Sequence, residues 1–437
     1  MKRYDSYKDS GVGWIGDIPS HWRKSKFKFV SELYTGNSLN DSQKLKYESD
    51  DPKDIPYVSS KDIDVDYQTV NYDNGLRIPK DENPLKISPK GSFLMVIEGG
   101  SSGRKMVFLE QDVCFVNKLC SFNSVENTKF QYYFIQSSNY QDKFRLSLSG
   151  LIGGVSISNL KDFELTLPPL SEQQQIVTFL DTKTSLIDSL IEKTQRKIEL
   201  LKEKRTSLIN EVVTKGLNPN VEMKDSGVEW IGEIPSGWDF VKVGHYTHVV
   251  RGGSPRPSGD PKFFNGDFIH WITVKDITSK SDKYVVSTET KLTEEGMKQS
   301  RVLEPETLVL TNSGATLGIP GILKIKGCIN DGSVGFLNVS QKVERDYLYY
   351  FWTTQTKLLL EQQSGYGQPN LNIEIVSNVR FPLPPLNEQQ QIVEYLDGKN
   401  GIIDKTISIE EKRIKLLKEY RQSLISEVVT GKLKVVE

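Results

Sequence analysis

The stretch Glu98-Gly-Gly-Ser-Ser-Gly-Arg-Lys105 comes nearest to the residue types of a catalytic nucleotide site. A phosphate-binding loop needs four residues between its two glycines, followed by a lysine and a hydroxyl residue. Here only three residues separate Gly99 from Gly103, and Arg104 occupies the lysine position. The stretch is therefore not predicted to bind a nucleotide.

The repeated phrase LPPL and one charged trio also resemble catalytic patterns. The proline-rich motif of adenine methyltransferases needs a polar Asn or Asp to bind the amine of a flipped base, and Leu167 and Leu383 cannot do so. Asp282, Glu289 and Lys291 have the residue types of a nuclease, but spacings this loose often arise by chance. Neither pattern predicts catalysis.

His245 and His248 lie three residues apart in a chain with four histidines. A metal site needs further ligands, and no carboxylate–cysteine set accompanies them. We expect structural roles for both histidines, and no metal or catalytic residue is predicted. The chain is therefore predicted not to be an enzyme.

Several loops rich in glycine, serine and cations have a binding chemistry instead. Backbone N–H groups in such loops approach phosphates, and Arg, Asn and Gln side chains read base edges in the major groove. The residues predicted to contact double-stranded DNA are Lys61, Ser101, Ser102, Arg104, Lys105 and Lys118 in the first half, and Arg251, Ser254, Arg256, Lys262, Lys275, Asn312, Ser313, Thr316, Tyr366, Gln368 and Asn370 in the second. Each of them taken singly fits an ordinary surface loop equally well.

These loops belong to a chain that repeats itself with a register of 216 residues. LPPLSEQQQIV at 167–177 returns as LPPLNEQQQIV at 383–393, and DSGVGWIGDIPSHW at 9–22 returns as DSGVEWIGEIPSGW at 225–238. A repeat this long is a duplicated module, because solenoid repeats have periods of roughly 20–50 residues. Similarity is high in these phrases and low between them, so one shared frame carries two divergent globules.

Each LPPL phrase predicts the start of a long helix. Prolines cannot continue a preceding helix, and Ser171 and Asn387 are expected as N-caps that close capping boxes with Gln174 and Gln390. Apolar residues then recur at alternating spacings of four and three, as in a coiled coil. The residues of this helix-pair seam are Ile187, Ile191, Ile198, Leu201, Leu208 and Val212 in the first helix, and Ile403, Ile407, Ile414, Leu417, Leu424 and Val428 in the second.

The two seams are predicted to pack on each other, and packing of each seam on its own globule is the alternative. Polar residues also match between the seams: Thr194 with Glu410, and Arg205 with Arg421. Glycine in a helix costs about 1 kcal/mol relative to alanine. Gly398 and Gly401 therefore predict a kink or a late start in the second helix.

The sequence between the repeated phrases predicts two mixed α/β globules. Short apolar runs at 55–63, 93–97, 269–277 and 308–310 read as strands, and Tyr132–Phe134 and Tyr349–Phe351 as parts of helices. Arg23–Val30 alternates basic and aromatic residues, which predicts a strand with Lys24, Lys26 and Lys28 on one face. That basic face could approach DNA or simply face solvent.

The composition is that of an ordinary globular protein with room for more than one core. With 437 residues and a net charge of −1, no global field attracts nucleic acid, so any DNA contact must come from local patches. Three cysteines, Cys114, Cys120 and Cys328, form neither a disulfide framework nor a zinc pattern. The N-terminus lacks a signal peptide and no stretch is apolar enough to cross a membrane. These features predict a cytoplasmic protein.

At full length the chain resembles the specificity subunits of type I restriction–modification systems. The resemblance is carried by the WIGxIPxxW and LPPLxEQQxIV phrases, the two long helices, and a Gly-Gly-Ser-Pro loop at 252–255 followed by Trp271–Asp276. It implies two target-recognition domains that each read one part of an asymmetric, split DNA target, separated by antiparallel spacer helices that set the gap. A two-domain adaptor that binds proteins and reads no DNA is the alternative.

The resemblance also implies the organisation and partners of the chain. Residues 1–166 and 217–382 would be the two target-recognition domains, and residues 167–216 and 383–437 the spacer helices. Two modification subunits would dock on these helices and methylate adenine with S-adenosylmethionine, and restriction subunits would cleave DNA with ATP and Mg²⁺. No cofactor is expected on this chain itself.

Overall fold

The computed structural model describes residues 2–80, 84–150, 153–229, 231–278, 283–361 and 371–435. The chain folds into two compact units. The first contains Met1–Arg196 and Glu410–Glu437, and the second contains Lys197–Ile409. Each unit therefore combines one globule with a part of each long helix, α6 (Leu170–Lys215) and α11 (Leu386–Val429).

Among the described residues, the globule of the first unit contains mostly short strands and six helices or helical turns before α6. In chain order they are β1 (Tyr7–Asp9), β2 (Asp17–Pro19), β3 (Arg23–Lys26), α1 (Phe27–Val30), β4 (Ser31–Thr35), α2 (Asp41–Lys46), β5 (Ile55–Val58), η1 (Ser60–Asp62), β6 (Arg77–Ile78), β7 (Ile87–Ser88), β8 (Phe93–Val96), β9 (Met106–Phe108), β10 (Val113–Phe115), β11 (Leu119–Ser124), α3 (Thr128–Gln136), α4 (Ser138–Leu146), α5 (Ile157–Asp162) and β12 (Glu164–Leu167).

The second unit repeats this plan. Its elements are β13 (Met223–Asp225), β14 (Glu233–Pro235), β15 (Asp239–Lys242), η2 (Val243–His245), β16 (His248–Arg251), β17 (Phe264–Ile272), α7 (Val274–Thr278), β18 (Tyr284–Val285), β19 (Lys291–Leu292), α8 (Glu294–Lys298), β20 (Arg301–Leu303), β21 (Leu308–Thr311), η3 (Gly314–Thr316), β22 (Pro320–Leu323), β23 (Gly327–Ile329), β24 (Ser333–Leu337), α9 (Arg345–Glu361), α10 (Ile373–Asn378) and β25 (Arg380–Leu383).

The sheets show that the duplication extends through the divergent globules. In the first unit the strand orders are β6-β5-β10-β7 and β4-β11-β8-β9, and in the second β19-β17-β23-β20 and β16-β24-β21-β22-β18. Strands β5 and β10 pair in parallel, as do β17 and β23 at the corresponding place. Both units are therefore mixed α/β globules, as predicted, and the order of their strands corresponds except that the second unit adds β18.

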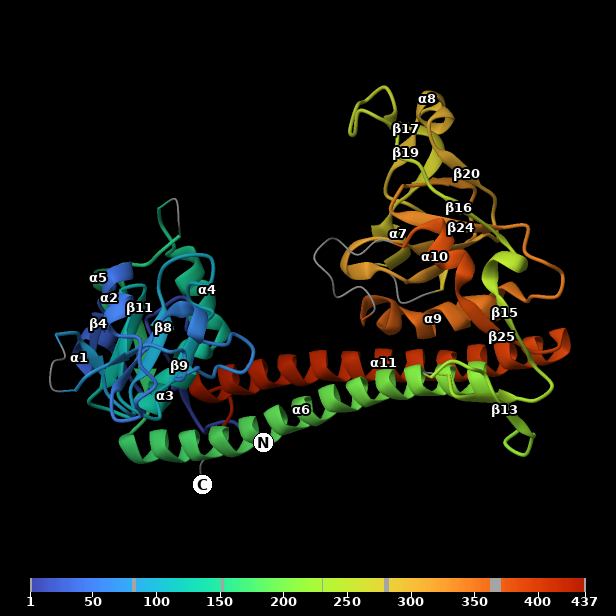
Figure 1. Ribbon diagram of the computed structural model, residues 1–437. Coiled ribbons are helices and arrows are strands. Elements are labelled where there is room, and N and C mark those ends of the chain that lie inside the picture. Colours follow the sequence, from blue (N-terminus) through green and yellow to red (C-terminus); the bar gives the residue numbers. More distant parts are fainter. Residues whose placement is uncertain are drawn as a thin grey trace. The chain divides into compact units, whose positions relative to one another are not determined.

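In each unit α6 and α11 pack together and run antiparallel (Figure 1). Of the predicted seam, Ile187, Ile191, Ile198, Val212, Ile403, Ile407, Leu424 and Val428 are buried, and Leu201, Leu208, Ile414 and Leu417 are partly buried. In the first unit Ile187 and Leu424 belong to the same core as the globule's aromatic residues. The seam thus packs both on the other helix and on the globule. The predicted packing of the two seams and its alternative are both observed.

The two arginines of the seam form repeat-related ion pairs. In the first unit Arg421 Nε donates to Asp188 Oδ1 over 2.9 Å. In the second unit Arg205 pairs with Asp404. Asp188 and Arg205 lie 216 residues before Asp404 and Arg421, so the same contact is made once in each unit.

The WIGxIPxxW and LPPLxEQQ phrases contact each other, which explains why both are repeated. The indole Nε1 of Trp22 donates to Glu172 over 3.1 Å, and that of Trp238 donates to Glu388 over 3.0 Å. Glu172 also accepts from Tyr4 Oη at 2.6 Å. Burial, followed by this hydrogen bond to a carboxylate, raises the pKa of Tyr4.

The first glutamine of each phrase completes the joint between globule and helix. Gln173 and Gln389 are buried, and their Nε2 atoms donate to the carbonyls of Pro168 and Pro384 over 3.0 and 2.8 Å. The Oε1 of Gln389 accepts from the backbone N–H of Glu344, just before α9. One side chain therefore fixes the turn into the long helix and the start of the aromatic helix.

The runs 55–63 and 269–277 are strands only to Val58 and Ile272, and the chain then forms η1 and α7. Three further local expectations were wrong. Helices α6 and α11 begin at Leu170 and Leu386, so Ser171 and Asn387 lie inside the first turn and are not the N-caps. Helix α11 begins at Leu386 and continues through Gly398 and Gly401, so the expected late start is wrong. An added Cβ at either glycine would meet open space, and packing along the seam outweighs glycine's low helix propensity.

The third error concerns Arg23–Val30, which is a strand only to Lys26 and then becomes helix α1. Phe29 is 70% exposed, so the alternation did not mark a buried face. Lys26 and Lys28 both pair with Asp162, at 3.2 and 2.8 Å, which offsets part of the charge of this face. It is not a free basic surface.

All three cysteines are free and buried. Burial raises the pKa of the Cys120 and Cys328 thiols, which keeps them protonated. Within the described ranges, the structure contains no helix of the length and apolar character that a membrane crossing requires.

Replacing Glu172 with leucine should destabilise the first unit. Two buried donors, Tyr4 Oη and Trp22 Nε1, would lose their acceptor, and each orphaned donor costs about 1–3 kcal/mol. We expect a loss of about 2–4 kcal/mol, measured by chemical denaturation with hydrogen exchange to locate the effect. The matched Glu388→Leu variant orphans Trp238 and should cost less. Equal losses in the two variants would contradict this reading.

Candidate nucleic-acid interface

The candidates of the first half lie in the segments that follow strands β5, β8 and β10 of the first unit. The loop 98–105 joins β8 to β9, and the Nζ of Lys105 donates to the carbonyl of Ser60 over 2.9 Å, next to Lys61 in η1. The backbone N–H of Ile97 donates to the carbonyl of Lys118 over 3.0 Å. Three loops far apart in the sequence are thus brought together.

Within this cluster the side chains differ in availability. Lys61, Arg104 and Lys118 are exposed, while Ser101, Ser102 and Lys105 are partly buried. Arg104 Nη2 donates to the carbonyl of Gly100 within its own loop, over 2.6 Å. Because this loop leads into strand β9 and not into a helix, it lacks the helix N-terminus that phosphate loops use.

Beside this cluster lies a hollow of about 610 Å³ that sequence reasoning missed. Its lining includes Glu98, Asn117, Gly153 and Gly154, contributed by the loops after β8 and β10 and by the Gly-rich stretch 149–154. The sequence signal for this hollow was the Gly-rich stretch itself, since a Gly-rich loop next to cationic loops lets the backbone approach a ligand closely. Asn117 carried no signal of its own.

In the second unit one carboxylate organises the Gly/Pro loop. Ser254 Oγ donates to Asp331 Oδ1 over 2.6 Å, and Arg256 Nη2 donates to Asp331 Oδ2 over 3.1 Å. Arg251 Nε donates to the backbone carbonyl of the same residue over 3.1 Å. Asp331 was missed because a single acidic residue in a loop carries no sequence signal. It holds three predicted residues on one side of the loop.

Two other candidates of the second half, Lys275 and Lys262, are not held by Asp331. Lys275 in α7 donates to both oxygens of Glu289, at 2.8 and 3.0 Å, and this partner raises the pKa of Lys275. Lys262 is exposed and lies over the ring of Phe263. Glu289 is thus engaged by a lysine, and Asp282 lies outside the described residues, so the nuclease reading gains no support.

The loop after β21 holds the remaining described candidates. Asn312 is fully buried, and its amide finds no partner among the described residues. Ser313 and Thr316 flank it and are partly buried. Tyr366, Gln368 and Asn370 lie outside the described residues.

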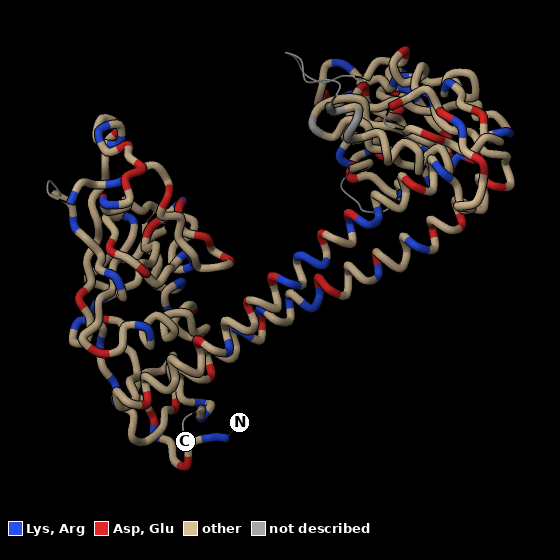
Figure 2. Tube along the Cα trace, turned by 60° about the horizontal axis from the view of Figure 1, so that its bottom comes forward, with Lys and Arg blue, Asp and Glu red and all other residues tan. Residues whose placement is uncertain are grey.

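His245 and His248 are exposed. Among the residues that the structure describes, no three His, Cys, Asp or Glu side chains are placed to hold a metal ion. Lysines, arginines and acidic residues alternate over each unit, as Figure 2 shows. Any nucleic-acid contact therefore depends on local loops such as those above.

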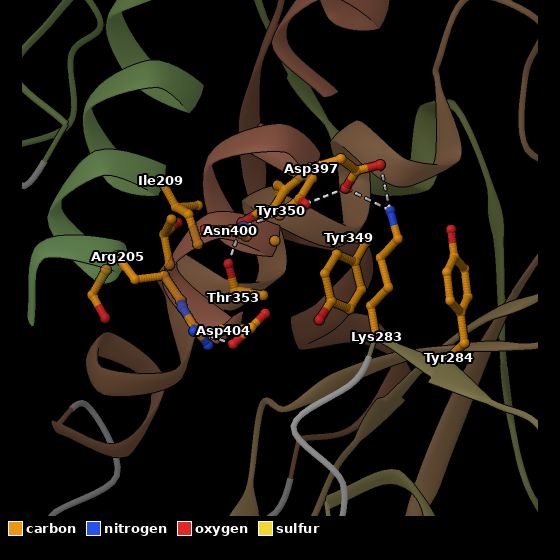
Figure 3. A pocket seen from close by; sticks show the side chains of 13 residues that line it. Arg205, Ile209, Lys283, Tyr284, Tyr349, Tyr350, Thr353, Asp397, Asn400 and Asp404 are labelled. Atoms are coloured by element: carbon orange, nitrogen blue, oxygen red, sulfur yellow. Dashed lines mark hydrogen bonds and ion pairs between the residues drawn. The ribbon is translucent and has the colours of Figure 1, made fainter. Parts of the chain in front are cut away.

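A repeated tyrosine–aspartate contact fastens each globule to its helix. Tyr133 Oη donates to Asp181 over 2.6 Å in the first unit, and Tyr350 donates to Asp397 at the corresponding place in the second. A lysine joins each pair. Lys129 lies 2.9 Å from Asp181, and Lys283 lies 2.8 Å from Asp397 (Figure 3). Helices α3 and α9 are thereby fastened to α6 and α11.

Comparison with known families gives one match, found twice. The family described as "Type I restriction modification DNA specificity domain" matches residues 19–200 and again residues 235–419. The chain is 24% identical over 445 residues to the type I restriction enzyme StySPI specificity subunit of Salmonella potsdam, covering 96% of this chain and 90% of that one. It is 24% identical to the MjaVIII specificity subunit of Methanocaldococcus jannaschii, covering 79% and 80%.

Other matches cover less of the relative or are more distant. The putative MjaX specificity subunit of the same archaeon is 26% identical over 284 residues, and the match spans 62% of that protein. A solved chain from work on complex assembly and conformational transition of the type I R-M system has a TM-score of 0.75 at 18% identity, covering 95% of this chain and 99% of that one. The HsdS subunit of Thermoanaerobacter tengcongensis gives 0.53 at 17%, covering 95% and 98%. These structures share the fold.

Replacing Asp331 with alanine should loosen the Gly/Pro loop without unfolding the unit. The Arg256–Asp331 pair is largely exposed, and exposed ion pairs contribute about 0–1 kcal/mol. We therefore expect a small change in stability but faster hydrogen exchange across residues 252–262. Glu304→Ala, which removes another exposed ion pair of this globule, is the control. Unchanged exchange in Asp331→Ala would show that the clamp does not order the loop.

Proposed function

The chain belongs to the type I restriction–modification DNA specificity family, and from this premise we propose that its two globules each read one half of an asymmetric, bipartite DNA target. The chain is the DNA specificity subunit, which is not itself the catalyst, and the family binds no cofactor of its own. The proposal concerns how this chain divides recognition between its halves and which loops carry it.

The observation that carries the proposal is one strand topology with two different sets of loops. The order of strands around the parallel pair is the same in both units. Yet loop 98–105 is held by Lys105 on Ser60, whereas the Gly/Pro loop of the second unit is held by Asp331. Since base readout depends on side chains in the grooves, different loops on one scaffold would read different sequences.

The boundaries of the recognition and spacer regions follow from the same reading. We propose residues 1–166 and 217–382 as the target-recognition domains, and 167–216 and 383–437 as the spacer helices. Strands β12 and β25 end at Leu167 and Leu383, where the recognition domains meet the helices. Continuous helices are suited to hold the gap between half-sites at a fixed length.

An exposed apolar stripe supports docking of modification subunits on the long helices. Tyr395, Ile402, Ile409 and Leu416 follow one another every seven residues along α11 and are 37–65% exposed. Leu186 and Leu200 occupy the repeat-related positions in α6 and are exposed as well. Seven-residue spacing is the pattern by which one helix packs against another. We infer that helices of two modification subunits cover these stripes.

The remaining partners are proposed from family membership. The chain assembles with other subunits and DNA in a type I complex. Modification subunits would supply S-adenosylmethionine and methylate adenine, and restriction subunits would supply ATP- and Mg²⁺-dependent cleavage. A cytoplasmic location is proposed on the same basis, and three free thiols fit a reducing compartment.

Matched arginine variants test whether the halves read independently. Arg256→Ala should weaken or relax only the half-site read by the second globule, and Arg104→Ala only the other half-site. A lost base contact costs about 1–3 kcal/mol. Base-resolution mapping of methylation in cells expressing each variant with its modification subunit gives the motif. A change in the opposite half-site would refute separate readers.

Variants in the stripe test the docking proposal. Ile402→Asn with Ile409→Asn should weaken assembly with the modification subunit at least about 10-fold, because polar groups would be buried without partners. Both side chains are exposed in the isolated chain, so its melting temperature should stay unchanged. The control, Glu411→Asn with Lys415→Asn, alters two exposed charged residues elsewhere on α11. Equal binding of parent and stripe variant in analytical ultracentrifugation would remove this surface from the interface.

A further inference from the structure

A polar cavity of about 650 Å³ lies in the second unit, where α6, α9 and α11 converge with β18. Figure 3 shows its lining, with Arg205 and Ile209 from α6, Tyr349 from α9, and Asn400 and Asp404 from α11. Cavities of roughly 300–1,000 Å³ accommodate small ligands or inserted side chains. Neither the recognition loops nor the exposed stripe contribute to it.

Two polar atoms in this lining are buried without a partner among the described residues. They are Arg205 Nε, a donor, and Asn400 Oδ1, an acceptor. The rest of each side chain is held, since Arg205 Nη2 donates to Asp404, and Asn400 Nδ2 reaches Tyr350 Oη at 3.4 Å. Buried polar groups in folded proteins are nearly always satisfied, so a fixed and unsatisfied donor–acceptor set points to a ligand.

The first unit shows the same place filled. There the Nε of Arg421, the residue related by the repeat to Arg205, donates to Asp188 over 2.9 Å. Gln422 reaches across to the carbonyl of Gln136. In the second unit Thr206 stands 216 residues before Gln422, and Thr353 follows Tyr350 by three residues as Gln136 follows Tyr133. Both smaller threonines line the cavity.

The threonines therefore open a space that glutamines occupy in the other copy. Loss of these two long side chains leaves room at this place. The arginine and the aspartate of the ion pair are retained in both copies. The acceptor differs as well, since the first unit has Thr184 at the position of Asn400.

The charges of the lining indicate a neutral occupant. Arg205 and Lys283 carry positive charge, and Asp397 and Asp404 carry negative charge, so the lining is balanced. Each cation is already paired with a carboxylate. An anion or a cation would enter without a free counter-charge, which is unfavourable in a partly buried site.

We propose that this cavity binds a carboxamide group. A carboxamide offers one carbonyl to Arg205 Nε and one N–H to Asn400 Oδ1, and it is neutral and planar. Tyr349 and Tyr350 supply aromatic walls. The group comes either from a free amide compound or from an Asn or Gln side chain of a partner subunit. The proposal concerns binding by this chain and does not depend on how DNA is read.

Filling the cavity with the side chains of the other copy tests the proposal. In the full-length chain, Thr206→Gln with Thr353→Gln places glutamines where the first unit has them. Ser207→Gln, at an exposed neighbouring position of α6, is the control. Binding of acetamide and L-glutamine is measured by calorimetry and by the shift of melting temperature. Protection of residues 349–354 and 397–404 from hydrogen exchange is measured with and without the modification subunit.

A free ligand predicts saturable binding of one amide probe to the parent and the Ser207→Gln control, weakened at least about 10-fold in the filled variant. A partner side chain predicts protection on adding the modification subunit, present in parent and control and lost in the filled variant. A filled variant that melts no lower than the parent shows that folding is intact. If no probe binds and the modification subunit gives parent and filled variant equal protection, the proposal is overturned.

Discussion

The antiparallel pairing of α6 with α11 is the constraint on which both units depend. Neither repeat of the sequence makes a unit by itself, because the core of the first unit contains Leu424 and Val428 from the end of the chain. The second unit likewise buries Val212 and Val213 from the helix that begins in the first repeat. Each globule is therefore built on two helices that come from different copies of the duplicated module.

This exchange explains which parts of the duplication stayed alike. Trp22 and Trp238 bind the first-turn glutamates of their own helices, and each also packs against the glycine that ends the other helix, Gly431 or Gly216. A Cβ at Gly431 would lie 2.3 Å from Pro19, so the contact is too close for a side chain. Residues at these junctions are constrained by both long helices at once, whereas the recognition loops are constrained by neither helix.

Periodic and repeated features could be predicted from the sequence, because each depends on spacing along one element. The seam, the mixed α/β globules and the repeat of the two phrases follow from such spacing, whereas the contact between the phrases does not. The start of α6 at Leu170 and the passage of α11 through Gly398 were missed, since tertiary packing decides them. Asp331 was also missed because its role depends on loops 75 and 77 residues away in the sequence. Loop residues became a candidate site only through such long-range contacts.

The central claim is that one duplicated frame presents two independent DNA readers. Base-resolution mapping of adenine methylation, in cells that express the chain together with its modification subunit, tests it most directly. The account predicts a motif of two specified segments, separated by unspecified bases of constant number. A single contiguous motif, or two segments separated by a variable gap, would contradict it.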